Sequence, residues 1–383
     1  MKILKRFLQF LLIIIALAVS GLYISGNGYL VKGIRCTYLR GETSATIDDY
    51  QFFAHREIES TKEIPWQEGN DYNTIALSGR FSNALEEYES VALLVIQGDS
   101  IRQEHYWDGY GPHSLSNSFS MAKSIVSMLT VIAIQEGKIK SLNQKVSDFI
   151  PELKGEYAKD LEVEHLLRMC SGLDWTEHYT SPFSVTAKAY YTRNLEKLIL
   201  QQEITAPPGE KFVYKSGNTQ LMALVLERAT GVKIGAYTSQ KLWTPLGAGN
   251  TALWTLDREH GTEKAYCCFN SNARDFARFG QLYLDSGNFA GTQIIDSMWI
   301  TESTRPTSTK TGITDYYGLS WWLAPQFDTP IYYMRGVFGQ YVIVIPELDL
   351  VAVRLGHKRS SVVVNEHRVD LITYVEELLK AYK

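Results

Sequence analysis

The chain has 383 residues, of which 45% are hydrophobic and 12% aromatic, and its formal net charge is −4 at pH 7. A chain of this length and apolar content can bury a large core, which excludes intrinsic disorder and permits one large domain or two smaller ones. The slight acidity excludes the broad basic surface that is typical of nucleic-acid-binding proteins, so no nucleic-acid partner is expected.

The N-terminus predicts a membrane anchor. Three basic residues among the first six precede an apolar run from Phe7 to Ile24 that is long enough to span a hydrocarbon core. These charges would hold the N-terminus in the cytoplasm and place the rest of the chain on the extracytoplasmic, periplasmic side. A signal peptide cleaved near Ala16-Leu17-Ala18 and a buried core helix are the alternatives. Because the apolar pattern continues to Ile24, we favour an uncleaved anchor over residues 1–25.

Cysteine and histidine spacing indicates neither a metal site nor a cofactor. Cys267 and Cys268 are adjacent in the chain, and we expect them not to pair with each other. No C-x-x-C or H-E-x-x-H pattern occurs among the four cysteines and eight histidines. The sequence therefore predicts no metal and no cofactor.

Two strands are predicted ahead of the first long helix. Residues 26–84 show little periodicity, and we expect a connecting extension that packs loosely against the main domain, residues 85–383. A continuous apolar run at 91–96 predicts a buried strand, and residues 101–107 predict a second one after a Gly-Asp turn.

A long apolar helical pattern begins close to Ser120. From Lys123 onward, apolar residues recur at three- and four-residue spacing, so Ser120 and Lys123 project side by side in the first turn. Serine needs an adjacent base to become a nucleophile. A lysine can be that base only as the neutral amine, which the positive end of a helix favours. One Ser-x-x-Lys match is about what chance provides, so a helix-capping serine beside a solvated lysine is the alternative.

The rest of the chain mixes helices and strands. Strands at both ends of the domain with helices between them indicate an α+β fold whose sheet combines N- and C-terminal segments. The predicted helices cover 163–170, 194–201, 219–230, 273–284 and 369–382, and the predicted strands cover 317–323, 337–345 and 350–355.

Four motifs in this order carry a family resemblance. They are Ser120–Lys123, His165–Leu173, Pro208–Tyr214 and Gly336–Pro346. The chain resembles the serine beta-lactamase, penicillin-binding protein and related esterase superfamily, and especially its class C-like, family VIII esterase and 6-aminohexanoate-oligomer hydrolase branch. The resemblance implies a beta-lactamase/transpeptidase-like fold, with an antiparallel sheet flanked by helices, an all-helical lobe and an active site between them.

The resemblance also implies roles for particular residues. Ser120 would be the nucleophile of a covalent acyl-enzyme, Lys123 its proton acceptor, and Tyr214 the proton shuttle to the leaving group. A phenol serves at neutral pH only if a nearby cation favours its anion, and Lys123 is the candidate. A buried structural tyrosine is the alternative for Tyr214. If Gly336 aligns with the glycine of the third motif, the backbone N–H of Val337 would join that of Ser120 in an oxyanion hole.

Two positions depart from the superfamily's pattern. Ser216 stands where many relatives carry asparagine, and its hydroxyl could bond to Lys123 or to substrate. Met334-Arg335-Gly336 replaces Lys-Thr-Gly, which argues against efficient antibiotic hydrolysis unless Arg335 binds the carboxylate instead. We interpret the literal Lys310-Thr311-Gly312 as a surface turn.

Four aromatic residues near these motifs suggest an aromatic-walled cleft for an apolar or linear substrate. They are Trp175, Tyr332, Tyr333 and Tyr341.

The sequence therefore predicts a membrane-tethered serine hydrolase that cleaves a small-molecule or peptide-like amide or ester. The alternative is a weak or inactive protein of the same fold that binds or senses a cell-wall fragment, and the changes at Ser216 and Arg335 motivate it. An alpha/beta-hydrolase is set aside because no Gly-x-Ser-x-Gly elbow occurs.

Overall fold

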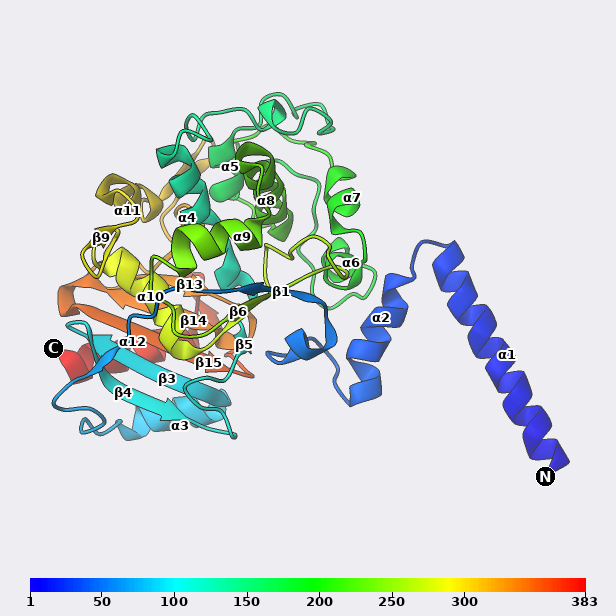
Figure 1. The fold of residues 1–383 in the computed structure, drawn as a ribbon, viewed down its shortest axis with the longest axis horizontal. Coiled ribbons are helices and arrows are strands. Elements are labelled where there is room, and N and C mark those ends of the chain that lie inside the picture. Colours follow the sequence, from blue (N-terminus) through cyan, green and yellow to red (C-terminus); the bar gives the residue numbers. More distant parts are fainter.

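The structure, a computed structural model, describes all 383 residues, and a seven-stranded sheet forms the centre of its main body (Figure 1). Neighbouring strands are antiparallel except for β2 and β4, which run parallel. The order β12-β13-β14-β15-β3-β4-β2 joins early and late segments of the chain, as predicted. The strands are β2 (Gln67–Glu68), β3 (Ser90–Gln97), β4 (Ser100–Tyr106), β12 (Trp322–Leu323), β13 (Tyr332–Arg335), β14 (Tyr341–Ile345) and β15 (Leu350–Gly356).

Helices cover both faces of this sheet. α3 (Gly79–Glu87) and α12 (Val369–Tyr382) share a buried apolar cluster with one face, and α10 (Ala273–Leu284) packs against β14 and β15 on the other. Gly280 allows the close approach of α10, because a Cβ there would lie 2.6 Å from Val351 Cγ1 and 2.8 Å from Val342 Cγ1. The predicted α+β layering of sheet and flanking helices is confirmed.

A helical lobe lies beside the sheet. Its centre is α4 (Ala122–Gln135), which is buried from Ala122 to Ala133 and packs against α8 (Ser216–Thr230). α8 ends at Gly231, as predicted, since the left-handed φ of 73° there suits glycine. The remaining helices are α5 (Val163–Leu167), α6 (Val185–Tyr191), α7 (Leu195–Leu200), α9 (Ile234–Thr238) and α11 (Ser297–Ser303).

The expected loose packing of residues 26–84 is wrong. A second sheet ties this segment to the domain, and Ile47 and Ile58 are fully buried. The pairing joins residues about 200 positions apart, so local sequence periodicity could not reveal it. The sheet has the order β1 (His55–Ile58), β6 (Ala252–Thr255), β7 (Phe269–Ser271) and β5 (Ser116–Asn117).

The first helix, α1 (Lys2–Ile24), stands apart from the folded body (Figure 1). None of its residues is buried, and it is long and apolar enough to cross a membrane. Such a helix serves as an anchor or as a signal sequence. The short connection Ser25–Gly28 leads from it into α2 (Tyr29–Cys36), which packs against α6.

Two predicted strands are shorter than expected. The segment 317–323 contributes only β12, and 337–345 begins with a 3₁₀ turn before β14 starts at Tyr341. The turn arises because Phe338 adopts φ of 63°, which is incompatible with an extended strand.

The contact between α10 and the sheet predicts the effect of a single methyl group. Gly280→Ala should lower the free energy of unfolding by about 1–3 kcal/mol, because the new Cβ overlaps two valines of the sheet. Urea unfolding of the detergent-solubilised chain, followed by tryptophan fluorescence, measures the change. Gly79→Ala in α3 is the control, since nothing lies within 4 Å of a Cβ there. Equal midpoints for both variants would contradict the packing argument.

Candidate active site

Ser120 and Lys123 meet where the helical lobe begins. Ser120 lies in the 3₁₀ turn Phe119–Met121, which leads directly into α4. Lys123 is only 1% exposed, and its Nζ donates to Ser120 Oγ at 3.1 Å and to the carbonyl oxygen of Tyr266 at 2.8 Å. Neither acceptor is a carboxylate, so hydrogen bonds to neutral groups hold the amine against the serine.

The backbone beside Ser120 takes a rare conformation. Phe119 has φ of 44°, a region that side chains disfavour. Phe338 has φ of 63°, and the two rings meet edge to face with their centroids 5.5 Å apart. Such backbone strain persists where the surrounding packing holds it, often at functional sites.

Gly336 lets the end of β13 lie directly against this turn. A Cβ at Gly336 would lie 2.2 Å from the carbonyl oxygen of Ser118, so only glycine fits. Val337, the next residue, lines the same cavity as Ser120. The alignment of Gly336 with the glycine of the third motif requires this placement. The backbone at Ser120 and the backbone at Val337, which are the two parts of the predicted oxyanion hole, lie at the same cavity.

Tyr214 lies on another side of Lys123. Lys123 Nζ is 5.2 Å from the centroid of the Tyr214 ring. The ring packs against Trp322 and Tyr317, with centroid separations of 5.6 Å and 6.0 Å. The Ser120 hydroxyl and the Tyr214 ring therefore both lie close to the Lys123 amine.

A cavity of about 380 Å³ opens at Ser120. The N-terminal segment forms one of its walls, which the sequence pattern did not indicate. This wall consists of Leu30, Gly33 and Ile34 of α2 and of Thr37, Tyr38, Thr43, Ser44 and Ala45. The lining also includes Tyr179, Tyr190 and Tyr191, together with Ser216 and Tyr266.

Ser216 lines the cavity, but its hydroxyl is bound to Glu177 instead of Lys123. Ser216 Oγ and the Ser216 backbone N–H donate to the two Glu177 oxygens, each at 2.6 Å, and Trp175 Nε1 donates at 3.0 Å. An ionised carboxylate is a strong acceptor, and here it caps the positive end of α8. Sequence reasoning missed Glu177, because only the fold brings it to the start of α8.

Arg335 lies outside the cavity lining. Its Cζ is 3.2 Å from the centroid of the Trp322 ring, and its Nη1 donates to the carbonyl oxygen of Glu366 at 3.2 Å. The literal Lys310-Thr311-Gly312 is an exposed turn between β10 (Thr307–Thr309) and β11 (Gly312–Thr314), as predicted.

The four aromatic residues predicted to line the cleft do not line it. Trp175, Tyr332, Tyr333 and Tyr341 are at most 8% exposed and belong to the core, because their strands or loop face packed layers. Aromatic residues do line the cavity, but they come from other segments: Phe119, Tyr179, Tyr190, Tyr191, Tyr266 and Phe338.

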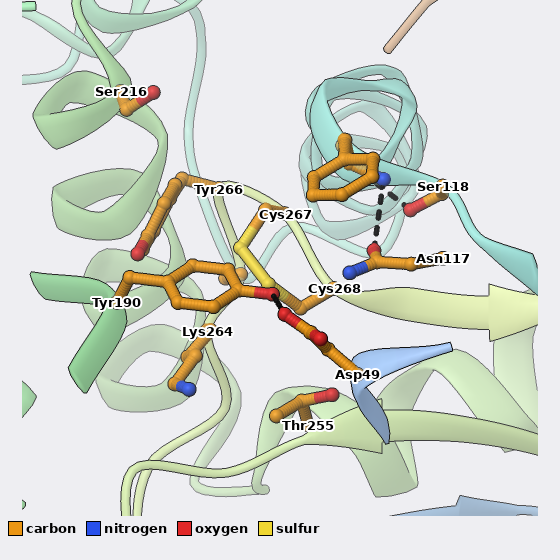
Figure 2. The surroundings of a disulfide bond; sticks show 12 residues. Asp49, Asn117, Ser118, Tyr190, Ser216, Thr255, Lys264, Tyr266, Cys267 and Cys268 are labelled. Atoms are coloured by element: carbon orange, nitrogen blue, oxygen red, sulfur yellow. Dashed lines mark hydrogen bonds between the residues drawn. A yellow bond between two sulfur atoms is a disulfide. The ribbon is translucent and has the colours of Figure 1, made fainter. Parts of the chain in front are cut away.

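Cys267 and Cys268 form a disulfide with each other, contrary to expectation (Figure 2). The left-handed backbone at Cys268, with φ of 69°, turns the chain so that the two adjacent side chains can meet. Cys267 lines the cavity, and the residue before it supplies the carbonyl oxygen that holds Lys123. The disulfide therefore constrains the segment that positions the amine.

Tyr266 contributes its side chain as well as its carbonyl. Its hydroxyl is buried without a hydrogen-bond partner, and the residue lines the cavity. Burial raises the pKa of Tyr266 well above its ordinary value, so the hydroxyl stays protonated and can donate to a bound molecule. The sequence analysis assigned no role to Tyr266.

Comparisons with known proteins agree with this geometry. Residues 79–375 match the family described as Beta-lactamase. The 6-aminohexanoate-dimer hydrolase of Paenarthrobacter ureafaciens is 28% identical over 290 residues, which cover 71% of this chain and 73% of that protein.

Solved structures share the fold. A Bacillus anthracis protein, provisionally described as a 6-aminohexanoate-dimer hydrolase, aligns with a TM-score of 0.75 and 21% identity over 90% of this chain and 93% of its own. A family VIII carboxylesterase aligns with a TM-score of 0.59 and 16% identity over 80% of this chain and 98% of its own.

The glycine at the end of β13 yields a test of the site. Gly336→Ala should lower kcat for p-nitrophenyl butyrate by about 100-fold, because the Cβ pushes Val337 away from the nucleophile and shifts of about 1 Å cost that much. Gly111→Ala is the control, since its Cβ would meet nothing within 4 Å. Full activity of Gly336→Ala would show that this strand end does not position the reaction.

The disulfide yields a second test. The double variant Cys267→Ser/Cys268→Ser should lower kcat by about 10-fold through a less fixed Tyr266 carbonyl, while chemical reduction should lower the rate of the parent only. Hydrolysis rates with and without a phosphine reductant, with mass spectrometry to confirm reduction, measure this. A reduced parent with unchanged kcat would refute the positioning role.

Proposed function

Because the chain belongs to the beta-lactamase family of hydrolases, we propose that it is a serine hydrolase that cleaves an amide or ester through an acyl-enzyme on Ser120. The observation that carries the proposal is the 3.1 Å contact between Lys123 Nζ and Ser120 Oγ at the edge of an open cavity. A nucleophile within hydrogen-bond reach of a base is the arrangement that covalent catalysis needs. The names of the relatives, an amide hydrolase and a carboxylesterase, fit both bond types.

The proposed reaction has two halves. The neutral amine of Lys123 accepts the proton of Ser120 as Oγ attacks the carbonyl carbon, and the backbone N–H groups of Ser120 and Val337 stabilise the oxyanion. Tyr214 then delivers a proton to the leaving amine or alcohol, which departs and leaves the acyl group on Ser120. Water then attacks the Ser120 ester and gives its proton to Lys123 and Tyr214. These groups return a proton to Ser120 Oγ as the acid is released.

We also propose that α1 anchors the domain on the extracytoplasmic side of a membrane. The basic residues before the apolar run favour this orientation. Disulfides persist mainly in oxidising compartments, and the Cys267–Cys268 pair fits such a location. Because α2 lines the cavity and follows α1 closely, an anchored α1 would keep the site near the membrane surface.

Active-site labelling and hydrolysis test the proposal. A fluorophosphonate should label the full chain in detergent at Ser120, and Ser120→Ala should abolish both labelling and p-nitrophenyl butyrate hydrolysis. Lys123→Met should lower kcat by about 1,000-fold, since it removes the base, and Tyr214→Phe by about 100-fold. Tyr316→Phe is the control, because Tyr316 packs in the same aromatic cluster.

The outcomes separate the enzyme from the binding protein. Hydrolysis that persists in Ser120→Ala would overturn the acyl-enzyme mechanism. The replacement of the third motif at Met334–Gly336 is the observation that favours a binder. That reading would gain if the parent neither labels nor hydrolyses but binds a cell-wall fragment, and if Ser120→Ala keeps the same affinity.

A further inference from the structure

One charged residue lines the cavity that opens at Ser120. It is Arg359, and every other lining side chain is uncharged. Arg359 lies against the turn that carries Val337, because a Cβ at Gly339 would be 3.3 Å from Arg359 Cβ. Arg359 therefore lies beside the turn whose Val337 lines the same cavity as Ser120.

Arg359, which is partly buried, lacks the partners that the fully buried arginines have. Arg278 and Arg168 are paired with carboxylates, and Arg354 donates to the carbonyl oxygens of four residues. Arg359 forms no ion pair, and its side chain donates no hydrogen bond within the chain. Arg359 lines the cavity, where a ligand could reach its side chain.

Two further arginines act on Arg359, and the nearby Asp370 carboxyl accepts from the Ser360 N–H and the Tyr341 hydroxyl instead of Arg359. Burial lowers the pKa of Arg359 from the usual value, and the nearby charges of Arg368 and Arg335 lower it further. Arginine nevertheless stays protonated in proteins. The other two guanidiniums donate only to carbonyl oxygens, of Ser360, Ser361 and Glu366. A partly buried cation among like charges is costly unless an anion joins it.

We infer that Arg359 binds an anionic group, in the simplest case a carboxylate, on the substrate that Ser120 cleaves. The inference rests on the proposed hydrolase function and names its substrate class. A guanidinium matches a carboxylate with two parallel hydrogen bonds. The uncharged wall formed by α2 and the residues after it would take the rest of the molecule. The substrate would then be an amide or ester with an apolar chain and one anionic group.

Two pairs of esters test the inference. p-Nitrophenyl hexanoate is compared with the mono-p-nitrophenyl ester of adipic acid, which carries the carboxylate on the acyl side. Phenyl hexanoate is compared with 4-carboxyphenyl hexanoate, which carries it on the leaving group. The parent should prefer the carboxylated member of at least one pair, and this preference should weaken with salt.

The variants then assign the preference to one side chain. Arg359→Gln should lower kcat/KM for the preferred anionic ester by about 10–100-fold and leave its neutral partner within about threefold. Arg359→Lys should recover part of the loss. Arg305→Gln is the matched control, because Arg305 is exposed, pairs with Glu302 and does not line the cavity, so it should leave the ratio unchanged.

The failure of this inference differs from the failure of the proposed function. If Ser120 is labelled and esters are hydrolysed, but Arg359→Gln leaves both ratios unchanged, Arg359 has no such role. If no ester is hydrolysed, calorimetry with monomethyl and dimethyl adipate applies the same test to binding. Selective binding of the anion that Arg359→Gln removes supports the inference, and equal affinity of both variants overturns it.

Discussion

The site depends on the burial of one amine between two oxygen atoms. Lys123 reaches Ser120 because both belong to the start of the same helix, but it reaches the Tyr266 carbonyl only because a distant segment returns to that point. The helix is fixed by a buried face that runs almost its whole length against α8. The distant segment is fixed by its disulfide and by β7, which pairs with β5 just before the nucleophile. Packing on both sides thus holds a side chain that would otherwise be mobile.

The N-terminal segment changes what kind of site this is. Without it, the groove at Ser120 would be open on one side; with it, α2 and the residues up to Ala45 close a cavity. The same segment pairs with the body through β1, and the Tyr190 hydroxyl donates to Asp49 at 2.9 Å beside the disulfide (Figure 2). The segment between α1 and the domain therefore forms part of the cavity wall.

Local patterns predicted the elements whose burial is periodic. The helix at 273–284 and the C-terminal helix match α10 and α12, because one apolar face suffices to define each. The proximity of Ser120 and Lys123 was also predictable, because residues three positions apart on a helix lie side by side. Glu177 and the packing of residues 26–84 were not, because each depends on contacts between segments far apart in the sequence. The Cys267–Cys268 bond was not predicted either, because it accompanies a left-handed backbone at Cys268 that the sequence did not indicate.

The altered third motif and the cavity charge have one explanation. Arg335 is the last residue of β13, beside Gly336, but it stacks on Trp322 and lies outside the cavity lining. Gly336 is kept by sterics, since any side chain would strike the backbone at Ser118. Close packing therefore requires the glycine of the motif, whereas the positive charge can come from a different residue. Arg359 supplies a positive charge from the next segment, on the other side of the Val337 turn. A cation displaced in this way would accept a substrate of different shape from a beta-lactam, in a cavity that α2 helps to line.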